Sequence, residues 1–109
     1  MFGLFGKLTA KPGWRDALVE VLLEASRGVA QVDGCHLYVV STSPDDPDSA
    51  WIFEVWETQE AHAASLELNT AQALITRALP LLAGPPESGR VLAPVGGLGL
   101  EPVSRRPPP

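Results

Sequence analysis

The chain has 109 residues, of which 45% are hydrophobic and 19% charged, and its formal net charge is −5. This length allows one domain at most, and the acidic balance argues against DNA or RNA as a partner, because nucleic-acid binding needs clustered Lys and Arg. No segment is long and apolar enough to cross a membrane and no signal peptide opens the chain, so a cytoplasmic protein without membrane contact is expected.

Composition divides the chain into a domain, residues 1–94, and a C-terminal tail, residues 95–109. The tail is rich in Gly and Pro, which break helices and strands, and its pair Arg105 and Arg106 is interpreted as part of a solvated end rather than a peptide-recognition element. Within the domain the single cysteine, Cys35, excludes an intramolecular disulfide, and its apolar surroundings predict a buried thiol rather than a nucleophile.

Two periodic segments open the domain. Residues 2–10 alternate between two faces, which predicts a strand, and Gly3 and Gly6 indicate that another element approaches it closely. After the turn signal Lys11-Pro12-Gly13, apolar residues at helical spacing predict an amphipathic helix. Its apolar stripe consists of Trp14, Ala17, Leu18, Val21, Leu22, Ala25 and Val29.

Two further strands follow, at residues 35–41 and 51–56, and predict an antiparallel hairpin. The polar segment between them, Ser43–Asp48, is predicted to be a loop. The two faces of the first strand are Cys35, Leu37 and Val39 against His36, Tyr38 and Val40. Those of the second are Trp51, Phe53 and Val55 against Ile52, Glu54 and Trp56.

Two helices and a strand complete the domain. Thr58 is predicted to cap a short helix that runs to about Leu68, and Asn69 or Thr70 to cap a second helix carrying apolar residues from 71 to 82. Pro80 predicts a loose last turn, Gly84-Pro85-Pro86 stops the helix, and residues 88–94 form the last strand.

The order of these elements predicts an α+β fold of the ferredoxin-like, split βαβ kind, with an antiparallel sheet and its helices on one face. In such a fold the uncovered face of a monomer should be polar. Here both faces of the hairpin strands are apolar, and the exposed patch would exceed what monomers usually show. The pattern therefore predicts a homodimer in which a second sheet covers this face.

Three segments give this chain a family resemblance. Residues 2–13 resemble the opening strand and turn of the antibiotic biosynthesis monooxygenase (ABM) family, residues 34–40 its "pGC…Y" strand, and residues 51–62 its "E-x-W-x(5)-H" segment. Membership implies a dimeric α+β barrel with a pocket between each subunit's sheet and helices. It also implies oxidation of quinols or polycyclic aromatic phenols with dioxygen, without flavin, haem or metal.

Such chemistry requires a substrate that supplies its own electrons, an apolar slot for its ring, and a proton acceptor at the phenol. Trp56, Phe5 and the stripe of the first helix are the candidates for the slot. Histidine side chains exchange protons near neutral pH, so His62 is the natural proton acceptor. Tyr38 and His36, on one strand face, are candidates to orient a phenol or quinone oxygen. Asn69 and Arg77 are candidates for further polar contacts.

Each candidate has a structural alternative. Trp56 could pack in the core or an interface, His62 could be structural, Tyr38 and His36 could pack the sheet, Asn69 could be a cap and Arg77 a solvated helix residue. Haem-degrading relatives use an Asn, a Trp and a His at positions that correspond here to residues near 5–7, Ser65 and Ile75, so haem degradation is not expected.

No metal or cofactor site is predicted. The aspartates 45, 46 and 48 lack the spaced ligands and closing Glu of a calcium loop, and Gly96–Gly99 does not lead from a strand into a helix as a dinucleotide motif does. A flavin enzyme is disfavoured because no phosphate-binding loop is present. The second functional hypothesis is a non-catalytic ligand-binding or partner-interaction domain on the same fold, because fold alone does not define function.

Overall fold

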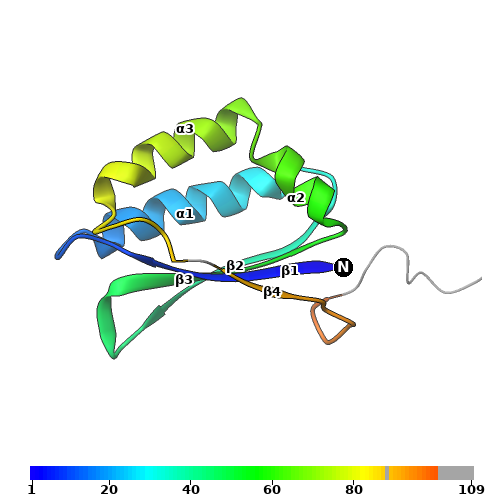
Figure 1. Ribbon diagram of the computed structural model, residues 1–109, viewed down its shortest axis with the longest axis horizontal. Coiled ribbons are helices and arrows are strands. Elements are labelled where there is room, and N and C mark those ends of the chain that lie inside the picture. The colour runs from blue at the N-terminus through cyan, green and yellow to red at the C-terminus, as the bar shows by residue number, and fades with distance from the viewer. Residues whose placement is uncertain (88, 101–109) are drawn as a thin grey trace, which may run out of the picture.

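The computed structural model describes residues 1–87 and 89–100. Helices lie on one face of a four-stranded antiparallel sheet whose strand order is β2-β3-β1-β4 (Figure 1). The elements in chain order are β1 Phe2–Thr9, α1 Arg15–Val29, β2 Cys35–Ser43, β3 Asp46–Trp56, α2 Gln59–Ser65, α3 Asn69–Ala78, the 3-10 turn η1 Leu79–Leu81, and β4 Arg90–Leu92. The ferredoxin-like α+β fold predicted from the sequence is confirmed.

Register defines which residues share a face of the sheet. On β1, Leu4 pairs with Glu54 and Leu8 with Ala50, so these residues lie on the face covered by the helices. Phe5 pairs with Phe53 and Lys7 with Trp51, so these four lie on the opposite, outer face. The core follows this division, because Leu18 and Leu22 of α1 pack on Ala10 and Ala50.

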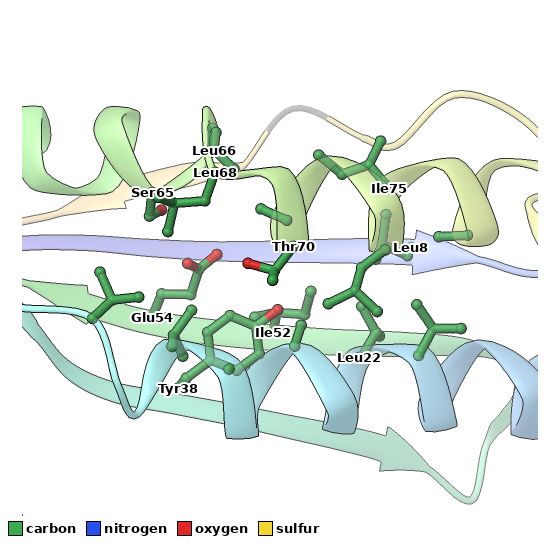
Figure 2. Close-up of a pocket in the computed structure, with 18 of the residues that line it drawn as sticks. Leu8, Leu22, Tyr38, Ile52, Glu54, Ser65, Leu66, Leu68, Thr70 and Ile75 are labelled. Carbon is green, nitrogen blue, oxygen red and sulfur yellow. The ribbon is translucent and has the colours of Figure 1, made fainter.

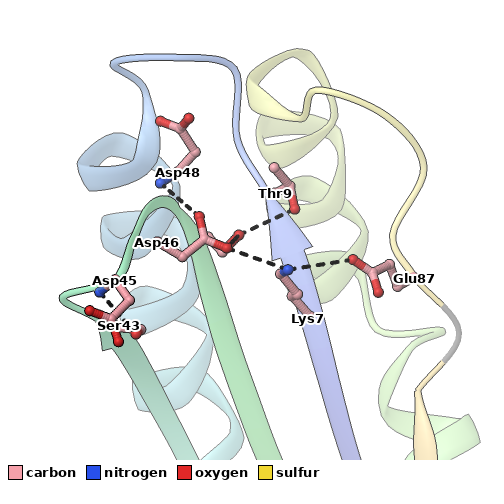
Figure 3. Close-up of polar contacts among 8 residues, drawn as sticks. Lys7, Thr9, Ser43, Asp45, Asp46, Asp48 and Glu87 are labelled. Carbon is pink, nitrogen blue, oxygen red and sulfur yellow. Dashed lines mark hydrogen bonds and ion pairs between the residues drawn. The ribbon is translucent and has the colours of Figure 1, made fainter.

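The β2–β3 hairpin is longer than predicted. Ser43 pairs with Asp46 and only residues 44 and 45 remain in the turn, so the predicted loop over Ser43–Asp48 is wrong. Polar side chains can occupy these strand ends because they bond to one another. The Asp46 carboxylate accepts a hydrogen bond from Ser49 at 2.8 Å and pairs with Lys7 at 3.4 Å (Figure 3).

The helix ends agree with the sequence at one position and differ at another. Thr58 caps α2 as predicted, since its hydroxyl accepts a hydrogen bond from the Ala61 N–H at 3.0 Å. Asn69 and Thr70 do not cap α3: the helix begins at Asn69 and the cap position is Leu68, without a side-chain hydrogen bond. Pro80 lies in η1, which confirms the predicted irregular end of this helix.

The segment after β4 returns to the sheet. β4 is shorter than predicted, and residues 93–100 contain neither helix nor strand. Pro94 lies so close to Gly3 that a Cβ on Gly3 would approach its ring to 3.0 Å, which agrees with the close approach predicted at Gly3. Gly6 has no such neighbour. Leu100 is buried, and the arginines of the tail lie outside the described residues.

The outer face of the sheet carries exposed apolar side chains, as the strand patterns predicted, together with Lys7 of β1 and Arg90 of β4. Phe5 and Val39 are each 42% exposed there, and the three helices all lie on the other side (Figure 1). In the described part of the chain no helix is both long enough and apolar enough to cross a bilayer.

Candidate active site

A cavity of about 260 Å³ lies between the helices and the covered face of the sheet. Its walls come from α1, α3, η1 and the three long strands, and most are aliphatic (Figure 2). The apolar lining includes Leu8, Val21, Leu22, Ala25, Val29, Ile52, Leu66, Leu68, Leu74, Ile75, Ala78, Leu79 and Leu82. The cavity exists because α3 stands off the sheet: none of its residues is fully buried.

The side-chain polar groups of this cavity gather around Glu54. Tyr38 of β2 pairs with Glu54 of β3 across the ladder, and both side chains enter the cavity from the sheet. Thr70 enters from the first turn of α3, towards the Glu54 carboxylate (Figure 2). Ser65 ends α2 and donates its hydroxyl hydrogen to the His62 carbonyl at 2.6 Å.

Glu54 has one oxygen engaged and one available. Its Oε1 accepts a hydrogen bond from the Trp56 indole N–H at 3.0 Å and lies 3.7 Å from His62 Nε2. No hydrogen bond joins a described residue to Oε2. Burial raises the pKa of the Glu54 carboxyl above its ordinary value, and the Trp56 hydrogen bond and the nearby His62 partly oppose that rise. The result is a carboxylate more basic than one in water.

His62 lies behind this carboxylate rather than in the cavity wall. Its ring packs against Phe2 at 5.5 Å and Trp56 at 5.7 Å between ring centroids, and its side chain is 15% exposed. It is absent from the cavity lining. His62 therefore contacts a ligand in the cavity only through Glu54 and Trp56.

Tyr38 lies in the cavity and His36 does not. A register shift between Cys35 and Leu37 places a bulge at His36, so the alternation that put both side chains on one face is wrong there. His36 Nε2 bonds to Glu57 instead. Burial, followed by the charge of Glu54, raises the pKa of Tyr38, so its hydroxyl stays protonated and can donate a hydrogen bond.

Three further candidates also lie outside the cavity lining. Phe5 is on the outer face of the sheet, opposite to Trp56, and stacks edge-on with Phe53 at 6.4 Å. Asn69 is exposed at the start of α3, and Arg77 is exposed and pairs with Glu24 of α1. Of the candidates from the sequence, the structure brings Trp56, Tyr38 and His62 together around Glu54.

Glu54 is the site residue that the sequence reasoning missed. Its signal is a charged residue in the middle of the strand Trp51–Trp56, on the same face as Trp56. A buried charge must find partners or neutralise, so a lone carboxyl on an apolar strand face points to a functional position. Cys35 is half-buried rather than buried as predicted, and this partial burial raises the pKa of its thiol.

No cluster of three His, Cys, Asp or Glu side chains suited to a metal ion occurs in residues 1–87 and 89–100. The aspartates at the hairpin tip take part in hydrogen bonds within the turn instead. The Asp48 N–H donates to the Asp46 carboxylate at 3.3 Å, and the Asp45 N–H donates to Ser43 Oγ at 3.2 Å.

The fold and the cavity define a ferredoxin-like α+β domain with a mostly aliphatic cavity between its sheet and its helices. The family model described as antibiotic biosynthesis monooxygenase matches residues 1–77, and the chain belongs to this family. No curated protein matches the chain.

Solved structures, two of them named for the same family, are similar over nearly the whole chain. One from Chloroflexus aurantiacus J-10-fl is 44% identical with a TM-score of 0.82, covering 92% of this chain and 98% of its own. One from Deinococcus radiodurans is 26% identical with a TM-score of 0.71, covering 89% and 93%. A Nitrosomonas europaea protein of unknown function is 25% identical with a TM-score of 0.74, covering 88% and 90%.

Proposed function

We propose that this protein is a cofactor-independent monooxygenase that oxidises a quinol or a polycyclic aromatic phenol with dioxygen. The observation that carries the proposal is the Glu54 carboxylate, which lies in a cavity with mostly aliphatic walls and whose Oε2 makes no hydrogen bond to a described residue. Family membership supports it at the level of the reaction class. The cavity is the place where a flat, reduced ring would be held away from water.

The reaction needs a substrate that provides every electron. A hydroquinone with a ring C–H gives a hydroxyquinone and water: one oxygen atom of dioxygen enters the C–H bond and the other leaves as water. The substrate supplies all four electrons, two in becoming a quinone and two in the ring hydroxylation. Removing the phenol proton makes the ring reducing enough to pass the first electron to dioxygen, so the proton acceptor controls the rate.

Four residues around the Glu54 carboxylate, Glu54 included, have a role in this proposal. Glu54 Oε2 accepts the phenol proton, and the raised pKa of this carboxyl makes it the stronger base. Trp56 holds the other oxygen and so fixes the carboxylate. Tyr38, kept protonated by burial, donates to the second substrate oxygen. His62 acts through Glu54 as a positioning residue, which revises the role expected for it from the sequence.

Oxygen uptake on a panel of hydroquinones and anthrones tests the proposal. We expect uptake above the uncatalysed rate, and a fall of about 10²-fold or more in kcat for Glu54→Gln, the usual contribution of a general base. Glu57→Gln is the matched control, since Glu57 bonds to His36 outside the cavity. Uptake equal to the uncatalysed rate across the panel, or full activity in Glu54→Gln, would contradict the proposal.

One observation favours the second function, a non-catalytic binding domain: few convergent polar groups line the cavity. A non-catalytic domain would bind the same aromatic ligands in the absence of oxygen and show no uptake when oxygen is added. The two functions therefore separate in a single pair of measurements, one of binding and one of turnover.

We also propose that the working unit is a homodimer formed through the outer face of the sheet. The support is the apolar composition of that face, where Phe5 and Val39 are 42% exposed, together with the absence of any described helix over it. The cavity of each subunit lies on the other side of its sheet, so dimerisation leaves both cavities open to substrate.

A further inference from the structure

The cavity is polar at one end only. Glu54 and Tyr38 face each other at one level of the sheet, and Thr70 lies in the adjacent first turn of α3. At the other end the lining side chains are Leu8, Leu22, Ala78, Leu79, Leu82 and Pro86. None of these has a polar side-chain atom, and the Leu82 N–H is already bonded to the Leu79 carbonyl at 3.2 Å.

The two ends are separated along the strands. Glu54 pairs with Leu4 of β1, whereas Leu8 pairs with Ala50. Leu4 and Leu8 are four residues apart on β1, which corresponds to about 13 Å along an antiparallel strand. The helix above gives the same span, because Thr70 and Ala78 are eight residues apart, or about 12 Å along α3. Figure 2 shows Glu54 and Leu8 at well-separated positions along β1 and β3.

We propose that the substrate is a hydroquinone with one hydrocarbon side chain, its hydroxyl groups at Glu54 and Tyr38 and its chain among Leu8, Leu22 and Leu82. This inference rests on the proposed function and narrows its substrate class. It selects a quinol whose oxygen atoms are all at one end over a polycyclic phenol that has oxygen atoms on several rings.

The reason is the cost of burying an oxygen atom at the apolar end. A hydroxyl group moved from water to an apolar site without a hydrogen-bond partner weakens binding by about fivefold or more, and the lining side chains at this end of the cavity offer no such partner. A hydrocarbon chain gains free energy in the same place. Glu54 is the only charged side chain among the described residues that line the cavity, so an anionic substituent would also be repelled.

Binding of hydroquinones that differ only in their side chain, measured in the absence of oxygen, tests this inference. The first series is methyl-, butyl- and hexylhydroquinone, for which we expect Kd to fall about two- to fourfold per methylene. The second ligand is hexylhydroquinone with a hydroxyl at the end of its chain, which we expect to bind at least about fivefold more weakly than hexylhydroquinone. Equal Kd values for these two ligands, or a Kd independent of chain length, would overturn the inference.

Variants at the apolar end of the cavity test where the hydrocarbon side chain of the ligand lies. Ala78→Leu fills the apolar end and is expected to weaken hexylhydroquinone binding about tenfold while leaving methylhydroquinone binding unchanged. Ala73→Leu is the matched control, since it adds the same side chain to an exposed position of α3 outside the cavity lining. Leu79→Ala is a second variant at a residue 57% exposed, where folding is not at risk. It is expected to weaken only the long-chain ligand.

Failure of this inference is distinguishable from failure of the proposed function. If oxygen is taken up with methylhydroquinone but longer hydrocarbon side chains bring no gain in affinity, the proposed site for the hydrocarbon side chain is rejected and the monooxygenase proposal stands. If affinity rises with the length of the hydrocarbon side chain but no oxygen is taken up, the monooxygenase proposal is rejected and the proposed site for the hydrocarbon side chain stands. Equal effects of Ala78→Leu on both ligands would also reject the chain site, because they would show a general disturbance of the cavity.

Discussion

Glu54 is a carboxyl group that the fold holds largely away from water, with a side chain 13% exposed. Burial raises its pKa above the ordinary 4.5, so the folded chain binds the proton more tightly than the unfolded chain. The free energy of unfolding therefore falls as pH rises from the ordinary pKa through the raised one. Glu54→Gln avoids this cost. We expect the variant to be more stable than the wild type at pH 8, with the difference shrinking towards pH 4.

Urea denaturation at several pH values measures this difference. Gln at position 54 keeps an oxygen that can accept the Trp56 hydrogen bond, so the variant removes the charge with little loss of packing. Glu20→Gln, at an exposed position on α1, controls for the change in net charge. A gain in stability that is the same at pH 4 and pH 8 would show that Glu54 is not ionised at a cost in the folded protein.

In the proposed mechanism, His62 affects catalysis through the charge state of Glu54. A positive charge on His62 lowers the pKa of Glu54, so removing His62 should raise that pKa further. For His62→Phe, which keeps the ring contacts with Phe2 and Trp56, we expect the acid limb of the kcat/KM profile to move to higher pH. Activity at high pH should remain within a few-fold of wild type.

The two roles considered for His62 give different pH profiles. If His62 were itself the proton acceptor, His62→Phe would lose most of its activity at every pH. His62→Gln separates packing from charge, because it removes the ring as well as the charge and should show the same shift in the acid limb.

Residue roles in this site were only partly predictable from the sequence. Trp56, Tyr38 and His62 follow from the types of residue that aromatic chemistry needs, and they lie together. His36 was misplaced because it was assigned from strand alternation, and Phe5 because alternation does not show which face of β1 lies with Trp56. Phe5 is on the other face of the sheet from Trp56, and the bulge at His36 reverses the alternation locally. Sequence alone does not reveal a one-residue bulge.

Helix α2 holds His62 and Ser65 in place, and its first turn depends on one cap. Thr58 accepts a hydrogen bond from Ala61 N–H, so Thr58→Ala should lower the free energy of unfolding by about 1 kcal/mol. Thr58→Ser should restore most of it. Asn69→Ala is the natural comparison, because Asn69 makes no cap hydrogen bond, and we expect it to change stability by less than about 0.5 kcal/mol.

Denaturation of these variants under one set of conditions would decide between the two cap positions. A loss at Asn69 as large as the loss at Thr58 would contradict the assignment of the helix starts. The comparison also explains why one cap was predicted correctly and the other was not. Gln72 fits a capping box with Asn69 in sequence, but its side chain donates to the Leu66 carbonyl at 2.6 Å, so a local alternative replaces the box.

At the scale of whole elements, periodicity predicted the type of every helix and strand but not all of their ends. The long helix α1 and the order of the strands follow from apolar spacing alone. The hairpin tip was predicted as a loop because it is rich in Asp, Ser and Pro, yet it is strand up to a two-residue turn. Contacts across the sheet, such as Lys7 with Asp46, stabilise polar strand ends, and local composition does not report them.

The whole molecule has one sheet face covered by helices and an opposite face that no described helix covers, although Pro94 lies on it against Gly3. That asymmetry was predicted from the apolar residues on both faces of the hairpin strands. The cavity was not predictable in size, because it depends on how far α3 stands from the sheet. Exposed Leu66, Leu68, Ile75 and Leu79 mark this separation, since a closely packed α3 would bury them.

The proposed dimer rests on the outer face, where apolar surface exposed to water is costly. Two sheets that pack face to face lie about 10 Å apart and exclude water between them. We expect light scattering at micromolar concentration to give about twice the chain mass of 11.6 kDa. Phe5→Lys places a charge on this face and should yield a monomer, because a buried unpaired ammonium group costs several kcal/mol at each of two symmetric positions.

Trp14→Lys is the matched control for the dimer, since Trp14 precedes α1 and is 54% exposed. It should keep the dimer mass. Phe5 is itself 42% exposed in the single chain, so Phe5→Lys should retain the circular dichroism of the folded domain while losing its partner. A wild type that scatters as a monomer at these concentrations would mean that water, not a second sheet, covers Phe5, Val39 and their neighbours, and the dimer would have to be abandoned.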